Sequence, residues 1–161
     1  MKLIKLTQDK FAKVDDRDFG KVNQYKWYFS NKQGAATQIH ISGSNWRERT
    51  QRKKTILMHR FILDAPKYVE VDHINGNRLD NRRKNIRLCA HADNMRNLKL
   101  RKDNTSGYKG VTKSYGKWTA HIQFNKKGIN LGYFKDKKDA AKAYNEAAKK
   151  YFGEFARLND I

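Results

Sequence analysis

The sequence of 161 residues contains one cysteine and one proline, has few acidic residues, and lacks any long hydrophobic run. The single cysteine, Cys89, excludes an internal disulfide and a multi-cysteine structural zinc site. We predict that Cys89 is a small buried side chain, as most unpaired cysteines are. The missing apolar run argues against a membrane span, and the charged residues 1–6 are unlike a signal peptide. We therefore expect a cytoplasmic protein that is not secreted and does not bind membranes.

The charge balance points to a polyanionic partner. Lys and Arg total 36 against 16 acidic residues, which gives a formal net charge of +20. So large an excess repels itself, and nucleic acid is the first candidate to neutralise it. Aromatic residues make up 12% of the chain, which argues against a disordered basic tail because such tails lack the residues for a core.

The N-terminal part, residues 1–63, contains short runs in which apolar and polar residues alternate. This alternation predicts strands at residues 10–14, 25–29 and 37–42. The apolar run 55–63 is predicted to cross the core, with His59 in a structural role. The polar loop 43–54 carries Arg47, Arg49, Arg52, Lys53 and Lys54. It is either a solvated turn or an arm that contacts phosphates, and the sequence leaves both open.

The C-terminal part is organised more simply. Residues 99–107 are polar, basic and rich in turn formers, which indicates a linker between domains at 1–98 and 108–161. Three alternating runs, 108–112, 118–124 and 129–134, predict an antiparallel sheet. Asp136 is predicted to cap a helix that runs to about Tyr151 and packs an alanine stripe on that sheet. The aromatic residues predicted for its core are Tyr133, Phe134 and Tyr144. The expected fold class is α+β.

The residues with the clearest chemistry lie in residues 71–88. Phosphodiester hydrolysis needs a base, a divalent cation and positive groups that hold the phosphates. His73 offers an imidazole that titrates near neutral pH, and Asp72 offers a hard oxygen ligand. The segment also supplies candidate phosphate donors, namely Arg78, Arg82, Arg83, Lys84 and Arg87.

The run 72–77, followed by 79–82 and 85–87, closely resembles the HNH motif of phage and intron-encoded homing endonucleases. That resemblance implies a ββα-metal fold, in which two strands and a helix at about 91–98 surround one divalent cation. It makes His73 the general base and Asn85 the amide that orients the imidazole. Asp72 and Asn94 would be the metal ligands, with His91 as the alternative to Asn94. The expected metal is Mg²⁺, with Mn²⁺ as the second choice, and the expected setting is a bacterial or phage-infected cell.

Segments 108–111, 118–122, 131–134, 140–148 and 153–159 resemble the plant Apetala/ethylene-response-factor DNA-binding domain. That family lays a three-stranded sheet in the major groove and backs it with one helix. The resemblance implies DNA contacts from Lys109, Thr112, Ser114, Tyr115, Trp118, His121 and Gln123. Thr112, Ser114 and Gln123 replace arginines of the plant proteins, so the plant target sequence is not carried over.

Together these features predict a site-targeted DNA endonuclease whose second domain tethers it to double-stranded DNA. The predicted products have 5′-phosphate and 3′-hydroxyl ends, and a monomer with one site should nick one strand. The main alternative is a non-catalytic, sequence-specific DNA-binding regulator with a relic HNH motif. A basic RNA-binding protein is a third class. The sequence leaves open whether the protein is a monomer or a dimer.

Overall fold

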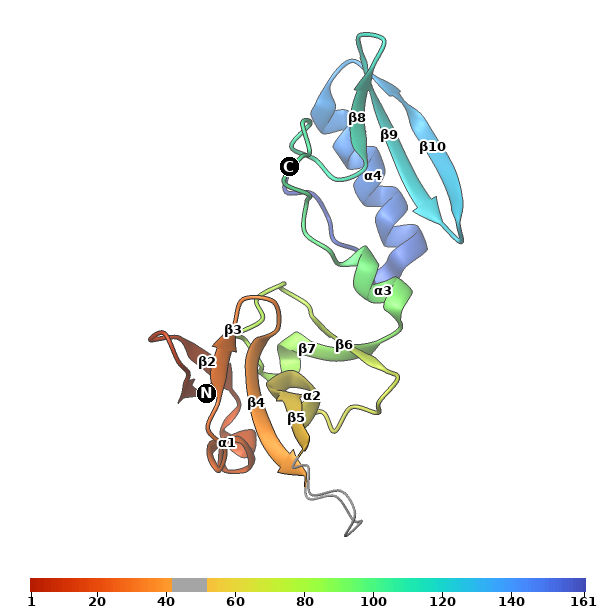
Figure 1. The fold of residues 1–161 in the computed structure, drawn as a ribbon. Coiled ribbons are helices and arrows are strands. Elements are labelled where there is room, and N and C mark those ends of the chain that lie inside the picture. Colours follow the sequence, from red (N-terminus) through yellow and green to blue (C-terminus); the bar gives the residue numbers. More distant parts are fainter. Residues whose placement is uncertain (42–51) are drawn as a thin grey trace. The chain divides into compact units, whose positions relative to one another are not determined.

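The computed structural model describes residues 1–41 and 52–161. The chain forms two compact units, Met1–His91 and Ala92–Ile161 (Figure 1). Both units mix helices with antiparallel sheets, which agrees with the predicted α+β class. The boundary between the units comes before the basic segment 99–107. A separate function for each part stays a prediction.

The first unit begins with a hairpin. Strands β1 (Lys2–Lys5) and β2 (Phe11–Val14) pair antiparallel. Their alternation buries Ile4, Ala12 and Val14 on one face, as expected for strands with one side on the core. Helix α1 (Asp16–Asn23) follows and buries Val22.

The second sheet has the order β3 (Tyr28–Ser30), β4 (Gly34–Ile41) and β5 (Arg52–Leu57). The strand predicted at 25–29 starts later than expected, because Trp27 is buried and its indole N–H donates to the Val22 carbonyl at 2.8 Å. The predicted core run 55–63 is the end of β5 followed by helix α2 (Met58–Ile62). Residues 42–51, which hold Arg47 and Arg49 of the predicted basic loop, lie outside the described residues.

The third sheet consists of β6 (Glu70–His73) and β7 (Ile86–Cys89), joined by a long loop that ends in the 3₁₀ turn η1 (Arg83–Asn85). Val71 and Ile86 join the core that Val22, Met58 and Ile62 form with the earlier elements. Cys89 is buried, as predicted.

The short helix α3 (His91–Arg96) begins at the last residue of the first unit, and its other residues belong to the second unit. Strands β8 (Val111–Ser114), β9 (Lys117–Phe124) and β10 (Lys127–Phe134) form an antiparallel sheet in the order β10-β9-β8. Helix α4 (Lys137–Phe152) covers one face of this sheet and ends in the turn η2 (Gly153–Phe155) (Figure 1). The predicted sheet and helix are confirmed.

Two local features explain how α4 is placed. The Asp136 carboxylate accepts a hydrogen bond from the Lys138 backbone N–H at 2.6 Å, which confirms the predicted N-cap. Ala140, Ala141 and Ala148 are fully buried against the strands, because small side chains let the helix backbone approach the sheet.

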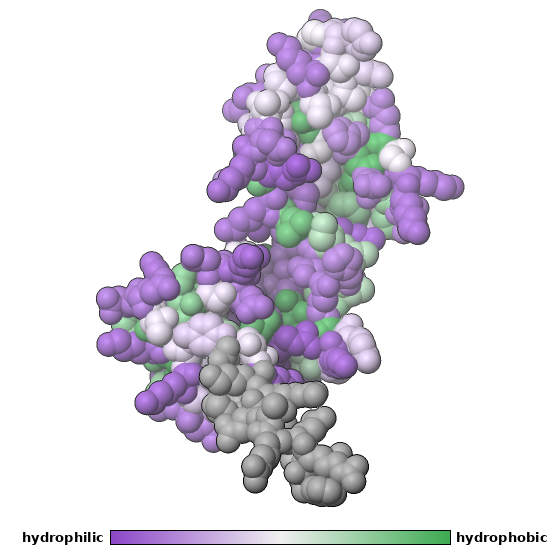
Figure 2. Space-filling view, viewed as in Figure 1, coloured by the Kyte–Doolittle hydropathy of each residue, from purple (hydrophilic) through white to green (hydrophobic). Residues whose placement is uncertain are grey.

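Hydrophilic side chains cover most of the visible face of each unit (Figure 2). Within residues 1–41 and 52–161, no helix is both long and apolar enough to cross a membrane.

Candidate active site

The candidate site is built where β6 ends. The antiparallel register places Asp72 opposite Arg87 and His73 opposite Ile86. Both predicted chemical groups are buried, with Asp72 5% and His73 6% exposed. Asp72 and His73 are neighbours in the chain, and both side chains are largely shielded from bulk water, which strengthens the electrostatic interactions of each.

The loop that follows His73 is tied to the N-terminal hairpin. The Lys13 backbone N–H donates to Leu79 O at 2.7 Å, and the Asn81 N–H donates to Lys13 O at 2.8 Å. These two bonds form a parallel bridge between β2 and the loop. These bonds hold the loop in place after His73. They also connect it to β2, a strand far away in the sequence.

Asn85, the predicted orienting amide, clamps this loop. Its Nδ2 donates to Asp80 O at 2.7 Å, and its Oδ1 accepts from the Asn75 backbone N–H at 3.0 Å. Asn85 therefore holds both ends of the turn after His73. The predicted hydrogen bond from Asn85 to the imidazole stays a prediction.

Two other side chains lie against the His73 ring. Its Nε2 lies 3.4 Å from Asn81 Oδ1. The ring of His59, on α2, packs edge-to-face at a centroid distance of 4.9 Å and an interplanar angle of 74°. Burial is the main cause that lowers the pKa of His73, while the hydrogen bond with Asn81 opposes this shift. The ring is thus favoured in the neutral form that a base requires.

Asp72, the residue before His73, forms an ion pair with Arg87. Asp72 Oδ2 accepts from Arg87 Nε at 3.2 Å and from Arg87 Nη2 at 3.0 Å. A buried carboxylate in this position fits a divalent cation by the chemistry of its oxygens. Mg²⁺ commonly uses only one or two protein carboxylates and completes its shell with water and substrate phosphate.

The other predicted ligands are placed differently. Asn94 lies on α3 in the second unit, so its predicted role beside Asp72 stays a prediction. His91 is exposed, and its Nδ1 lies 2.7 Å from Glu70 Oε1. In the described part of the chain, no group of three or more His, Cys, Asp and Glu side chains is arranged to hold a metal.

The arginines predicted to bind phosphate all have partners within the first unit. Arg82 makes a two-pronged bond with the buried Asp80, at 2.7 and 2.5 Å. This bond lowers the pKa of Asp80. Arg78 donates to backbone carbonyls of Asn31 and Lys32.

Arg83 reaches farthest along the chain. Its guanidinium binds the buried Asp18 on α1, with nitrogen–oxygen distances of 2.9 to 3.2 Å, and the Ile62 carbonyl at 2.9 Å. The described contacts thus make these arginines braces of the site, and their contacts with DNA stay predictions.

The sheet of the second unit has an open face opposite α4. Thr112, His121 and Gln123 are exposed, and Thr112 pairs with Thr119 across the strands. Because side chains two residues apart share a face, these groups lie on the open side. Ser114 shares the parity of Thr112, and Tyr115 is fully exposed in the next turn.

Two residues predicted to contact DNA, Trp118 and Lys109, make contacts within the second unit, and their DNA contacts stay predictions, whereas Tyr133 does not lie in the core as predicted. Trp118 lies on the helix face and packs with Val111 and the α4 alanines, so the ring serves the core. The Lys109 ammonium donates to the carbonyls of Arg96 and Leu98, and burial lowers its pKa to about 8. Tyr133, predicted as core, is 63% exposed, because a register shift between Asn130 and Gly132 turns it to the open face. Phe134 and Tyr144 do pack as predicted.

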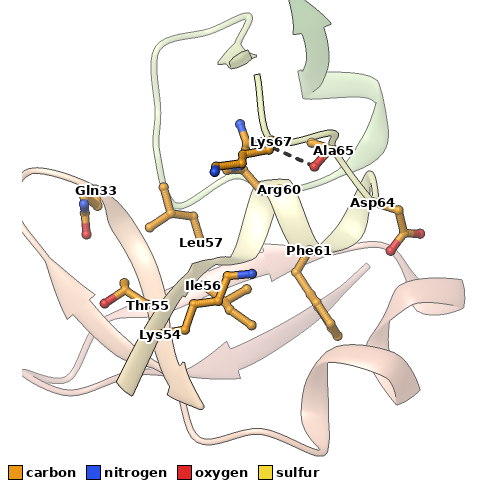
Figure 3. A pocket seen from close by; sticks show the side chains of 10 residues that line it. All are labelled: Gln33, Lys54, Thr55, Ile56, Leu57, Arg60, Phe61, Asp64, Ala65 and Lys67. Atoms are coloured by element: carbon orange, nitrogen blue, oxygen red, sulfur yellow. Dashed lines mark hydrogen bonds between the residues drawn. The ribbon is translucent and has the colours of Figure 1, made fainter. Parts of the chain in front are cut away.

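A cavity lies elsewhere in the first unit. It has a volume of about 490 Å³ and lies beside β5 and α2 (Figure 3). Ile56, Leu57 and Phe61 line it together with charged groups such as Arg60, whose guanidinium is held by the Ala65 carbonyl. None of the predicted catalytic or metal-binding residues lines it.

Comparison with known proteins gives one family match and several relatives. A model of the HNH endonuclease family matches residues 64–96, which include Asp72, His73, Asn85 and Asn94. The "Uncharacterized HNH endonuclease L560" of Acanthamoeba polyphaga mimivirus is 31% identical over 147 residues, which cover 87% of this chain and 70% of that protein.

Two further relatives match shorter stretches. "Protein 3.8" of Escherichia phage T7 is 45% identical over 47 residues, or 29% of this chain and 39% of that protein. The "Dehydration-responsive element-binding protein 2D" of Arabidopsis thaliana is 44% identical over 61 residues, or 35% of this chain and 30% of that protein.

Proposed function

Since this chain belongs to the HNH endonuclease family, we propose that it is a metal-dependent, homing-type DNA endonuclease with His73 as its general base. The observation that carries the proposal is the buried Asp72-His73 pair at the end of β6, under a loop fixed by Asn85. Membership of the family supports nuclease activity. The homing type, the identity of the base and the products are what the proposal adds.

In the proposed reaction, the neutral His73 imidazole takes a proton from water. The resulting hydroxide oxygen forms a bond to phosphorus, and the bond from phosphorus to the 3′ oxygen breaks. The leaving oxygen takes a proton from solvent, which gives 5′-phosphate and 3′-hydroxyl ends. Because one chain offers one such base, a monomer is expected to nick a single strand.

Asp72, with Asn94 as the predicted second ligand, would hold the divalent cation. When bound, the cation supplies stabilisation of the negative charge that develops at the leaving oxygen. Removal of divalent ions with EDTA should abolish plasmid nicking, and added Mg²⁺ should restore it. Asn94→Ala and His91→Ala compared at several Mg²⁺ concentrations show which side chain serves as the ligand, because only loss of the ligand raises the Mg²⁺ requirement.

The base assignment is tested by His73→Ala. The substitution should lower cleavage by roughly 10²- to 10⁴-fold while DNA binding, measured by fluorescence anisotropy, stays near normal. Asn125→Ala, a change in the exposed turn between β9 and β10, is the matched control and should cleave normally. Full cleavage by His73→Ala would contradict the proposal. Equal loss of binding and cleavage would indicate misfolding, which circular dichroism checks.

We assign DNA binding to the open face of the sheet in the second unit. The exposed His121, Gln123 and Thr112 carry this assignment, together with the partial likeness to the plant protein. His121→Ala combined with Gln123→Ala should weaken binding to a preferred site more than to random DNA. The alternative function, a non-catalytic DNA-binding regulator, predicts binding with no metal-dependent nicking of plasmid.

A further inference from the structure

Two side chains that contact the His73 ring each have a buried polar atom without a hydrogen-bond partner among the described residues. Within residues 1–41 and 52–161, three buried side-chain atoms have no hydrogen-bond partner: His59 Nδ1, Asn81 Nδ2 and Thr119 Oγ1. Two of these side chains, His59 and Asn81, also contact the His73 imidazole. Buried polar groups are almost always paired, and an unpaired one calls for an explanation such as a catalytic role.

His59 is an unusual choice for its position. It is 8% exposed, and burial, followed by the nearby His73, lowers its pKa to about 3. It therefore remains uncharged at neutral pH. A phenylalanine would fill the same space without an unpaired nitrogen, so packing alone does not account for a histidine here.

Asn81 shows the same pattern from the loop. It is fully buried, and its backbone is fixed by the bond to Lys13 O. Its Oδ1 faces His73 Nε2 at 3.4 Å, while its Nδ2 has no described partner. A leucine has nearly the same shape and would leave no amide unpaired.

We propose that His59 and Asn81 are positioning residues that fix the orientation and tautomer of the His73 ring. Asn81 Oδ1 accepts from Nε2–H and leaves the basic lone pair on Nδ1. The uncharged His59 ring holds the other side without competing for the proton. This inference rests on the proposed function, since it concerns the base of that reaction.

If the unpaired atoms of His59 and Asn81 lower stability but serve catalysis, removing them should lower activity without lowering stability. His59→Phe and Asn81→Leu should each leave the urea midpoint unchanged or raise it. Each should also lower kcat by roughly 10- to 100-fold, as loss of an orienting partner does, with little change in KM. A purely structural role would not separate kcat from stability in this way.

Thr119→Val is the matched control. It removes the third unpaired atom, which lies in the other unit and away from His73, so it should be no less stable than the wild type and serves as the reference for stability alone. The two test variants are independent, and each decides the role of its own residue.

The outcomes are distinct. A stable variant at either position with wild-type kcat would overturn the proposed role of that residue. A large loss of stability would overturn it too, because the polar atoms would then serve the fold. A wild-type chain without any nicking activity would instead sink the proposed function itself.

Discussion

Substitution of Arg83 by alanine separates two roles that the sequence and the structure suggest for it. The sequence predicts a phosphate contact. In the structure, the Arg83 guanidinium bridges Asp18 on α1 and the Ile62 carbonyl at the end of α2. If the role of Arg83 is structural, Arg83→Ala removes the bonds that connect α1 and α2 to the turn η1 before β7.

The size of the effect follows from burial. Asp18 is 4% exposed, and removing the partner of a buried charge costs about 3–5 kcal/mol when no other partner remains. Arg17 Nε, 3.9 Å from Asp18 Oδ2, stays in place and offsets part of this cost. The Arg83 side chain is 34% exposed, so solvent screens the pair and the loss is reduced to about 2 kcal/mol. For a unit of this size, that loss corresponds to a fall in Tm of roughly 8–16 °C.

The assay combines urea denaturation, followed by circular dichroism, with DNA binding at several salt concentrations. Lys84→Ala, an exposed neighbour, is the matched control and should change stability by less than about 0.5 kcal/mol. A phosphate contact contributes about 0.9 to the slope of log K against log salt. Unchanged stability together with a slope reduced by about that amount in Arg83→Ala would refute the bracing role.

Three further changes test other parts of the fold. Gly110→Ala should cost at least about 2 kcal/mol, because the new Cβ would lie 2.0 Å from a ring carbon of Tyr144 and φ is +72°; Gly128→Ala, with open space around it, should be nearly neutral in the same urea titration. Asn159→Ala removes two hydrogen bonds to the Lys109 backbone and should lower the unfolding free energy by about 2 kcal/mol; an unchanged midpoint would contradict this. At His59, the folded pKa is about 3 against 6.5 for the free side chain, so between these values the unfolded chain binds a proton that the folded chain does not. Stability should therefore fall as pH drops from about 6.5 towards 3, by up to about 1.4 kcal/mol per pH unit, and His59→Phe should flatten this dependence.

Local patterns predicted some elements well. The alternation in residues 118–124 and the alanine stripe after Asp136 correspond to β9 and α4. These predictions are confirmed because each depends on neighbours along the chain. The register of β10 was not predictable in this way. Its shift at Asn130 places Tyr133 on the open face, and alternation alone would place it in the core.

The site shows the same division. Asp72 and His73 were predicted as site residues from residue type and order along the chain; the structure places both, buried, at the end of β6, and their chemical roles stay predictions. The surroundings of His73 were not found, because His59 comes from another element and Asn81 takes its place through a bond to β2. A single histidine within an apolar run was a signal for His59, but only the structure shows that its ring contacts His73.

By itself, the sequence determined the charge, the chemical groups available to the site and the elements with strong local periodicity. The tertiary structure decided which charges neutralise each other. Arg83 meets Asp18 across 65 positions of the chain, and Arg87 meets Asp72 across the β6–β7 pair. Such pairings depend on long-range packing, which brings together side chains that no local pattern relates. For this reason, arginines that the sequence suggests as phosphate ligands have intramolecular partners in the structure, and their contacts with DNA stay predictions.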